Sequence, residues 1–317
     1  MRGLQLAALL IGACGACVAC LPAHAGDAYR WVDAQGRVHY ADRPGEGDVR
    51  QLRKVASVRE SVVKLRIQRD DARYLVWADN ALAGPVEVML HLRSGSNVRG
   101  EPALPARATV PALGSVLVAY LHPVDRKRGS QFDLALEMVP GQPGGNPDNA
   151  QYLFPLKTGA VQVEQGYGGE YSHNDAQNRY AVDFAAPIGT QVLAARDGVV
   201  MQIESDYGAA GLDQEQYAGR ANFIRIVHND GSMAVYAHLA ENGVQVRNAQ
   251  RVRAGQVIGI SGNTGFSSGP HLHFAVQVNR GMRLESIPFR MFTPRGILRL
   301  DEIKSAPPGP AAARHRL

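Results

Sequence analysis

The stretch Gly262-Asn-Thr-Gly-Phe-Ser-Ser-Gly-Pro-His-Leu-His-Phe274 decides the fold of the C-terminal half of the chain. Its first nine residues are rich in glycine and serine and predict a loop, and the residues from His271 onward alternate as in a strand. Because residues i and i+2 of a strand share a face, we expect His271 and His273 on one side and Leu272 and Phe274 in the core. Paired imidazoles suit metal binding or acid–base chemistry, although a His-x-His pair by itself is more often a chance surface pair.

Short alternating segments flank this strand from residue 158 to about residue 293, and none has a sustained helical period. Glycine-containing turns separate them, as in proteins built from short strands. We therefore predict an all-β domain over residues 158–293. Besides the strand that begins at His271, the expected strands are 192–194, 198–203, 223–227, 233–236 and 256–260.

Two more segments place polar groups on predicted strands. Alternation puts Asp183 on the face opposite its neighbours, and a carboxylate in the middle of a strand needs an ionic partner or a metal. The alternative to a metal is a salt bridge to Arg196. His173 precedes this strand in a polar loop, and further along the chain Tyr236 and His238 are expected to share a strand face.

Together these segments resemble the lysostaphin/LytM-type zinc endopeptidases of bacterial cell walls. The family's motifs occur in the family's order, and the resemblance covers residues ~165–290, a little over a third of the chain. It implies a β-sheet peptidase domain like the duplicated hybrid motif. The matching segments are Asp183-Phe-Ala-Ala-Pro187, Gly189-Thr-Gln-Val-Leu-Ala-Ala-Arg-Asp-Gly-Val-Val200, Tyr236-Ala-His-Leu239 and the loop and strand of residues 262–274.

The resemblance also implies one zinc ion per chain, with His173, Asp183 and His273 as ligands. Three nitrogen and oxygen ligands leave the fourth tetrahedral position to water, as in catalytic zinc sites. Zinc lowers the pKa of that water and polarises the scissile carbonyl. His238 and His271 are then catalytic residues that do not bind the metal. One is a base or orients the water, the other stabilises the oxyanion, and the sequence leaves open which does which.

The spacing of the first two ligands departs from the compact members of the family, in which they lie closer together. Ten positions separate His173 from Asp183, and Asp175 is a second carboxylate within this interval. We favour Asp183 because it lies in the Asp-Phe-Ala-Ala-Pro segment. His228 is expected in a hairpin turn, outside the site.

The first 25 residues have the features of an export signal: a basic start, an apolar stretch and an A-x-A cleavage site at Ala23-His-Ala25. All three cysteines lie in this segment, so the mature chain would have none and would suit an oxidising compartment. The alternative is a lipoprotein signal with a loose lipobox that ends at Cys14.

Four further regions are predicted. Residues 26–48 form a small hairpin module with aromatic cross-strand pairs, similar to a module of unknown function on exported bacterial proteins. Residues 49–60 are linker-like, residues 61–157 form a β-sandwich-like accessory domain that ends in a proline-rich linker at 140–147, and residues 294–317 form a partly disordered tail. The strands expected in the accessory domain are 62–67, 74–77, 86–92, 116–121 and 132–138.

The composition excludes several classes of protein. With 34 basic and 29 acidic residues interspersed over 317 positions, the net charge of +5 suits an anionic envelope but not a nucleic-acid polycation. Apolar residues make up 45%, which excludes wholesale disorder. Beyond residue 25 no apolar run reaches the ~18 residues that a membrane helix needs, so we expect no membrane span after signal cleavage.

We therefore predict an exported zinc endopeptidase that hydrolyses the peptide cross-links of peptidoglycan. Its expected location is the periplasm or cell envelope of a Gram-negative bacterium, or the medium after secretion, and a D-Ala–diaminopimelate cross-link is favoured over a glycine bridge. The alternatives are a non-catalytic relative that binds the wall or activates another hydrolase, and a scaffold with structural zinc. The presence of three ligands and two auxiliary histidines favours the enzyme.

Two hypotheses concern access to the predicted metal. The insert at residues 205–220 is long for a hairpin connection and is expected to form one wall of the substrate groove. The 61–157 domain is hypothesised to narrow access to the zinc, with a spacer or a wall-binding module as the alternative. A regulatory envelope protein is a candidate partner.

Overall fold

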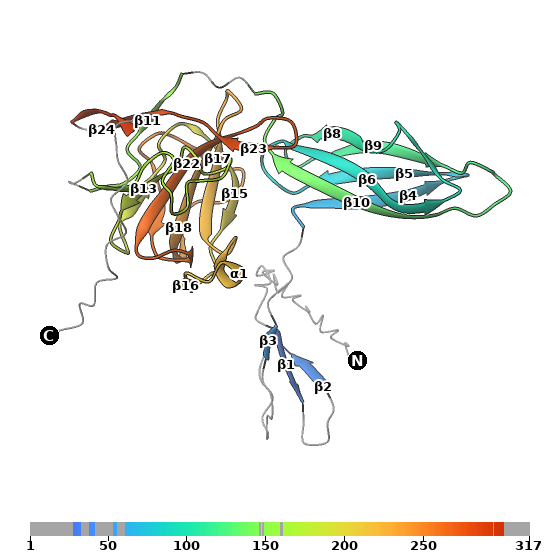
Figure 1. Cartoon of the computed structure of the whole chain (residues 1–317), viewed down its shortest axis with the longest axis horizontal. Coiled ribbons are helices and arrows are strands. Elements are labelled where there is room, and N and C mark those ends of the chain that lie inside the picture. Colours follow the sequence, from blue (N-terminus) through green and yellow to red (C-terminus); the bar gives the residue numbers. More distant parts are fainter. Residues whose placement is uncertain are drawn as a thin grey trace, which may run out of the picture. The chain divides into compact units, whose positions relative to one another are not determined.

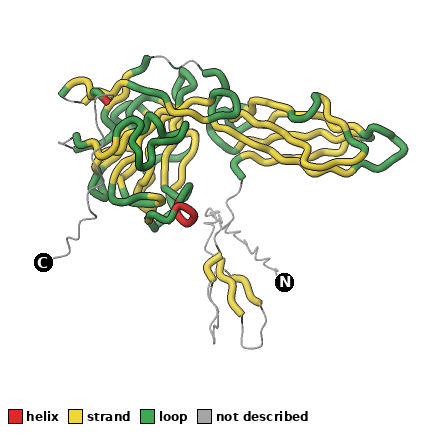
Figure 2. The backbone as a smooth tube through the Cα atoms, viewed as in Figure 1, coloured by secondary structure: helices red, strands yellow, loops and turns green. Residues whose placement is uncertain are grey.

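The computed structural model describes residues 28–32, 38–41, 53–55 and 61–300, except residues 146, 148, 159, 160 and 294. Within these ranges the protein is almost entirely β-structure, with a single turn of α-helix, α1 (Gln214–Tyr217) (Figures 1 and 2). The all-β prediction is therefore confirmed. The predicted signal segment lies outside the described residues. The chain divides into two units, residues 1–61 and 62–317.

The first unit contains the predicted hairpin and one strand that was not predicted. Strands β1 (Ala28–Val32) and β2 (Val38–Ala41) pair antiparallel. Strand β3 (Arg53–Val55), in the stretch expected to be a linker, pairs with the other edge of β1. The register places Trp31 opposite His39, so the prediction of aromatic cross-strand pairs was wrong in detail.

The second unit begins with a sandwich of two antiparallel sheets. Its strands are β4 (Val63–Asp70), β5 (Arg73–Asn80), β6 (Val86–Ser96), β7 (Arg99–Glu101), β8 (Ala106–Val110), β9 (Ser115–His122) and β10 (Gln131–Pro140). One sheet has the order β4-β5-β9-β7 and the other β10-β6-β8. Fully buried side chains such as Val76, Leu90 and Leu121 fill the space between them. The five predicted strands are present, and the short strands β7 and β8 were not predicted.

The larger sheet carries the candidate site. Its strands are β12 (Val163–Gln165), β13 (Val182–Ala185), β14 (Gln191–Leu193), β15 (Gly198–Glu204), β17 (Asn222–Val227), β18 (Met233–Val244), β19 (Arg251–Val252), β20 (Val257–Ser261), β22 (His271–Asn279) and β23 (Leu284–Ser286). The main path runs β12-β13-β22-β18-β17-β15-β19. The predicted strands of this region therefore form, with bounds shifted by a few residues.

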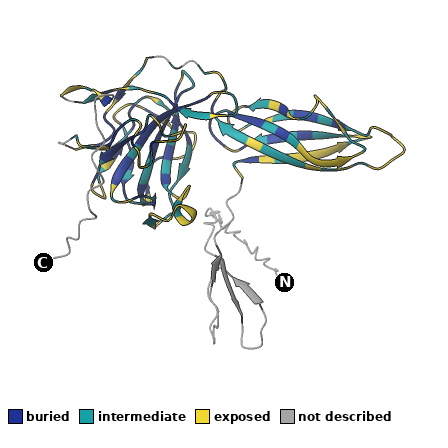
Figure 3. Ribbon diagram, viewed as in Figure 1, coloured by how far each residue is buried: buried dark blue, intermediate teal, exposed yellow. Residues whose placement is uncertain are grey.

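One face of this sheet is the hydrophobic core. Phe184 of β13, Tyr236 of β18 and Phe274 of β22 are fully buried there. Figure 3 shows stretches of the strands of this sheet in the dark blue of buried residues. Tyr236 and Phe274 make an edge-to-face contact at 5.1 Å between ring centroids. Burial of each such ring contributes roughly 1.5–3 kcal/mol, so the apolar half of each strand fixes which residues face the other side.

The predicted tail begins with ordered structure. Strand β24 (Arg290–Thr293) pairs in parallel with β11 (Gln151–Leu153) and antiparallel with β25 (Gly296–Leu298). The segment expected to be a partly disordered tail thus contains β25, and residues 301–317 lie outside the described part of the chain.

The sandwich and the larger sheet share a core. Met201 of β15 and Met233 at the start of β18 are fully buried among the apolar side chains of the sandwich. The amide of Ala83 donates to the carbonyl of Met201 at 3.0 Å. A Cβ at Gly84 would lie 2.7 Å from the Met201 sulfur, so a larger residue there would displace the Met201 side chain. The two parts therefore pack as a single unit.

The connection between them is held to both sides. Gly141 donates to the Pro85 carbonyl of the sandwich at 2.8 Å, and the Asn279 amide at the end of β22 donates to the Gly141 carbonyl at 3.1 Å. The stretch expected to be a linker, residues 140–147, is thus held at its start by hydrogen bonds to both the sandwich and the larger sheet.

Candidate metal centre

Strands β13 and β22 bring two of the predicted ligands together. They pair antiparallel with Asp183 directly opposite His273, on the face away from the core. The Nδ1 atom of His273 lies 2.9 Å from the Oδ1 atom of Asp183. The alternation read from the sequence is confirmed, since Val182 and Leu272 are buried in the core.

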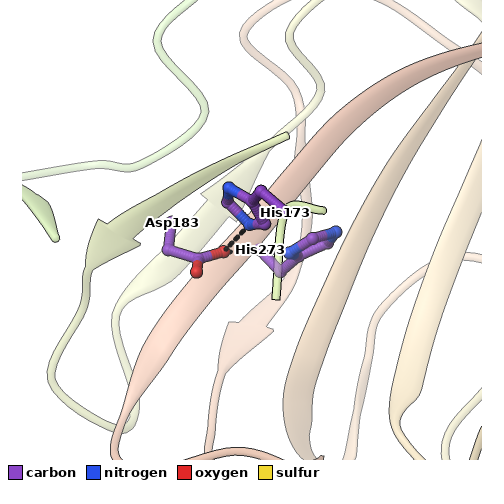
Figure 4. A group of neighbouring side chains, drawn as sticks. All are labelled: His173, Asp183 and His273. Atoms are coloured by element: carbon purple, nitrogen blue, oxygen red, sulfur yellow. Dashed lines mark hydrogen bonds and ion pairs between the residues drawn. The ribbon is translucent and has the colours of Figure 1, made fainter. Parts of the chain in front are cut away.

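His173 reaches the same carboxylate from the loop between β12 and β13. Its Nε2 atom lies 3.3 Å from Asp183 Oδ1, and its Nδ1 donates to the Gly166 carbonyl at 2.8 Å. One ligand atom from each of His173, Asp183 and His273 lies within 4.8 Å of the others (Figure 4). Two imidazole nitrogens and one carboxylate oxygen are the donor set of an open zinc site, so these residues fit a catalytic zinc ion.

The alternative carboxylate, Asp175, has other contacts. Its Oδ1 accepts hydrogen bonds from the amides of Gln177 and Asn178 at 2.7 and 3.0 Å, which closes a turn of its own loop. It is not part of the group of three that could hold a metal. The alternative salt bridge from Asp183 to Arg196 is also wrong, because Arg196 pairs with Asp230 at 2.7 Å.

The two auxiliary histidines lie beside this group. His271 Nε2 is 3.8 Å from Asp183 Oδ1, and its Nδ1 donates to the Gly269 carbonyl at 2.8 Å. His238 Nδ1 donates to the Thr264 carbonyl at 2.7 Å. The ring centroids of His238 and His271 lie 4.6 Å apart. All five predicted site residues are therefore brought together, and their roles remain predictions.

His238 reaches the site by a break in the alternation of β18. Its φ is +62°, in the left-handed region, and the register of β18 against β20 shifts after Leu239. Tyr236 therefore faces the core, where its hydroxyl accepts a hydrogen bond from the Ala195 amide at 2.8 Å, while His238 lines the groove. The expectation that these two residues share a strand face was wrong, because it assumed an unbroken strand.

Backbone carbonyls fix the orientation of three imidazoles. A carbonyl oxygen can only accept a hydrogen bond, so the Nδ1 atoms of His173, His238 and His271 carry the hydrogen. In the neutral rings Nε2 is then the basic atom, which can bind a metal or accept a proton. That of His173 faces Asp183 Oδ1 and donates a hydrogen bond to it only when the ring is protonated. The carbonyls belong to Gly166, Thr264 and Gly269. Because they are backbone groups, the side-chain motifs of the sequence could not identify them.

The carboxylate of Asp183 and the neighbouring imidazoles shift one another's pKa values. Burial favours the neutral acid at Asp183, but hydrogen bonds from His173 and His273 hold its pKa well below the usual range. Burial opposes charge on His173, yet the bond to Asp183 raises the pKa of His173. For His238, burial and then the neighbouring His271 and His273 lower the pKa to about 3, which keeps this ring neutral at pH 7.

Gln165 is a further residue of the site that the sequence reading did not identify. Its Nε2 donates to Ser172 Oγ at 2.7 Å and to the second carboxylate oxygen of Asp183 at 3.4 Å. It thereby holds the carboxylate with Oδ1 turned to the histidines. A lone glutamine in a short strand gives no sequence signal for such a role.

A groove of about 1130 Å³ runs over this face of the sheet. The insert forms part of it, as predicted, through Leu212, Gln214, Ala218 and Gly219. Among the described residues, those that line the groove all lie between 162 and 277, so none belongs to the sandwich. The hypothesis that the 61–157 domain narrows access is therefore not supported. In the described part of the chain no helix is long and apolar enough to span a membrane.

Comparison with known proteins matches two family models. Residues 177–284 match peptidase family M23, and residues 14–66 match a domain of unknown function, DUF4124. The second match covers the region expected to contain a small module of exported bacterial proteins.

Individual relatives match over about a third of the chain. Glycyl-glycine endopeptidase ALE-1 of Staphylococcus capitis is 39% identical over 120 residues, which are 37% of this chain and 30% of that protein. Peptidoglycan DD-endopeptidase ShyA of Vibrio cholerae is 42% identical over 96 residues, 30% of this chain and 19% of that protein. The chain thus spans less than a third of the length of either relative. Among solved structures, the catalytic domain of lysostaphin from Staphylococcus simulans is 36% identical, with 38% of this chain and 81% of that chain covered and a TM-score of 0.29.

Proposed function

The chain belongs to peptidase family M23 through the domain at residues 177–284, and on that premise we propose that it is an exported, zinc-dependent endopeptidase that hydrolyses the peptide cross-links of peptidoglycan. One observation carries the proposal. A carboxylate and two imidazoles converge to within 4.8 Å in an open groove, with two more imidazoles beside them that are not needed as ligands.

His173, Asp183 and His273 would hold the zinc. When bound, the ion supplies a water of lowered pKa and polarises the scissile carbonyl. The chain's own contribution is to place two imidazoles next to that position. His238 and His271 each have Nδ1 bonded to a backbone carbonyl, which leaves Nε2 for chemistry, so one could take the proton of the attacking water while the other, when protonated, could donate to the developing oxyanion.

The substrate class is proposed from the relatives. ALE-1 is named as a glycyl-glycine endopeptidase and ShyA as a peptidoglycan DD-endopeptidase, so both act on peptide bonds. Export by an N-terminal signal and the predicted envelope location favour the D-Ala–diaminopimelate cross-link over a glycine bridge. Domain bounds of 26–48, 61–157 and 158–293 remain part of this proposal.

Digestion of purified sacculi tests the proposal. The mature protein should convert cross-linked muropeptides to uncross-linked ones, identified by mass analysis after a muramidase has cut the glycan strands, and it should lose this activity with chelator and regain it with added zinc. Asp183→Ala is the matched inactive control and Asp175→Ala the active one, because only Asp183 lies in the metal group. Zinc-loaded protein that binds sacculi but releases nothing would favour the alternative of a non-catalytic wall-binding protein.

A further inference from the structure

Arg225 of β17 is a cation in the floor of the groove with no acidic partner among the described residues. It alternates with Ile224 and Ile226, which are fully buried in the core, so its side chain lies on the same face of the sheet as the metal group. Its Nη1 donates to Gln277 Oε1 at 2.7 Å. Its Nε is enclosed and has no acceptor.

The side chain lies across the sheet rather than away from it. Arg225 is opposite Val235 of β18, and Gln277 lies on β22 beyond it, so the guanidinium spans a strand to reach the amide. Gln277 is itself held, because its Nε2 donates to the Gln177 carbonyl of the loop at 2.9 Å. That bond turns the amide oxygen towards Arg225 and fixes the end of the arginine side chain.

The charge on this group has no acidic counterpart among the residues that the structure describes. Burial lowers the pKa of Arg225 to about 10, but the group stays protonated at pH 7. Other arginines of the same unit show what is missing: Arg196 meets Asp230 at 2.7 Å, and Arg66 meets Asp79 at 2.9 Å. A desolvated cation without a carboxylate is unfavourable, and a planar guanidinium with unused N–H groups matches a carboxylate in shape.

We propose that Arg225, positioned by Gln277, forms a subsite of the groove that binds a free carboxylate of the peptide substrate. This inference rests on the proposed function, since it concerns the substrate of the same groove. His273 and Gln277 are four residues apart on one strand, about 13 Å, and the guanidinium lies on the near side of Gln277. The bound carboxylate is therefore on the order of 10 Å from the metal group, about three residues of extended peptide.

Two matched cross-linked peptides test the subsite, one with free α-carboxylates and one with the same groups amidated. The wild-type protein should prefer the free acid by roughly 10- to 100-fold in kcat/KM, as expected for a charge-assisted bidentate hydrogen bond. Arg225→Gln should lose this preference and cleave the amidated peptide within about twofold of wild type. Arg225→Lys keeps the positive charge but lacks the paired N–H donors of the guanidinium, so it should retain part of the preference for the free acid.

Arg247→Gln is the control, because Arg247 is exposed and outside the groove. Thermal unfolding shows whether each variant is folded. Calorimetric binding of the same two peptides to wild type and Arg225→Gln, with the metal removed, gives a readout that does not depend on cleavage.

The outcomes separate the two proposals. Discrimination in binding without cleavage would support the subsite and overturn the proposed enzyme. Equal treatment of free and amidated peptides by the wild-type protein in both measurements, or an equal loss of both in Arg225→Gln, would overturn the subsite whatever the activity.

Discussion

Replacement of His228 should remove a specific part of the acid sensitivity of this protein. His228 follows β17, is 4% exposed, and donates from Nδ1 to the Asp197 carbonyl at 2.7 Å. Its Nε2 is enclosed without a partner, so protonation of the folded ring would bury a second N–H with no acceptor. Burial accordingly lowers the pKa of His228 from 6.5 to about 4.

The sign and size of the effect follow from these two values. In the unfolded chain His228 takes up a proton near pH 6.5, whereas the folded ring does so only near pH 4. Unfolding therefore binds a proton between these values, and the free energy of unfolding falls as the pH falls. The full difference corresponds to roughly 3 kcal/mol, of which about 2.5 kcal/mol is lost between pH 7.5 and pH 4.5.

His228→Asn is the informative variant, because its amide can still donate to the Asp197 carbonyl and cannot titrate. It loses ring packing against Tyr152 and should be less stable than wild type at pH 7.5. Its stability should nevertheless fall by about 2.5 kcal/mol less than wild type on going to pH 4.5.

Urea unfolding of the metal-free proteins at a series of pH values measures this difference, and metal removal excludes the pH dependence of zinc binding. Every other titrating group contributes equally to both curves. Parallel curves for wild type and His228→Asn would refute the reasoning.

Three other predictions concern the groove. Asp183→Ala should lose zinc and activity while Asp175→Ala keeps both, since only Asp183 contacts the two histidines; elemental analysis that gives the reverse result would show the ligand assignment to be wrong. His238→Ala and His271→Ala should keep stoichiometric zinc and lose ~10²–10⁴-fold in turnover, and a zinc-free His271→Ala protein would instead make His271 a ligand. Replacement of residues 205–220 by a short turn should change the pattern of muropeptides released with zinc still bound, and an unchanged pattern would remove the insert from substrate selection.

The core of the site could be predicted because its signals are local. Apolar residues on one side of β13 and β22 leave only one face for Asp183, His271 and His273, and alternation along a strand determines that face. The family resemblance then implied that Asp183 and His273 bind one metal ion, and the pairing of β13 with β22 places them opposite each other. The strands with clear alternation were found for the same reason. Strand β7 has only three residues, too few to show alternation, and β8, Ala106-Arg-Ala-Thr-Val110, has small alanine side chains at two of its three alternating apolar positions.

What could not be predicted depends on breaks in this regularity and on distant partners. The left-handed backbone at His238 turns its ring into the groove next to Ala237. The segment Tyr236-Ala-His-Leu239 contains no glycine or asparagine that would indicate such a backbone conformation. Arg225 and Gln277 meet from positions 52 residues apart, and each lies on a strand that looks ordinary in the sequence. Such pairs become visible only when the order of the strands is known.

The sandwich contacts the larger sheet at the end opposite the metal group, which bears on how this domain can act. Met233 and Asn279 make the contacts, and Asn279 lies six residues beyond His273 on the same strand, about 20 Å away. A domain attached there cannot cover His271 or His238 without breaking the shared core around Met201. This attachment favours the predicted alternative, a spacer or a wall-binding module, over a domain that narrows access to the site, because no sandwich residue of the described part of the chain lines the groove.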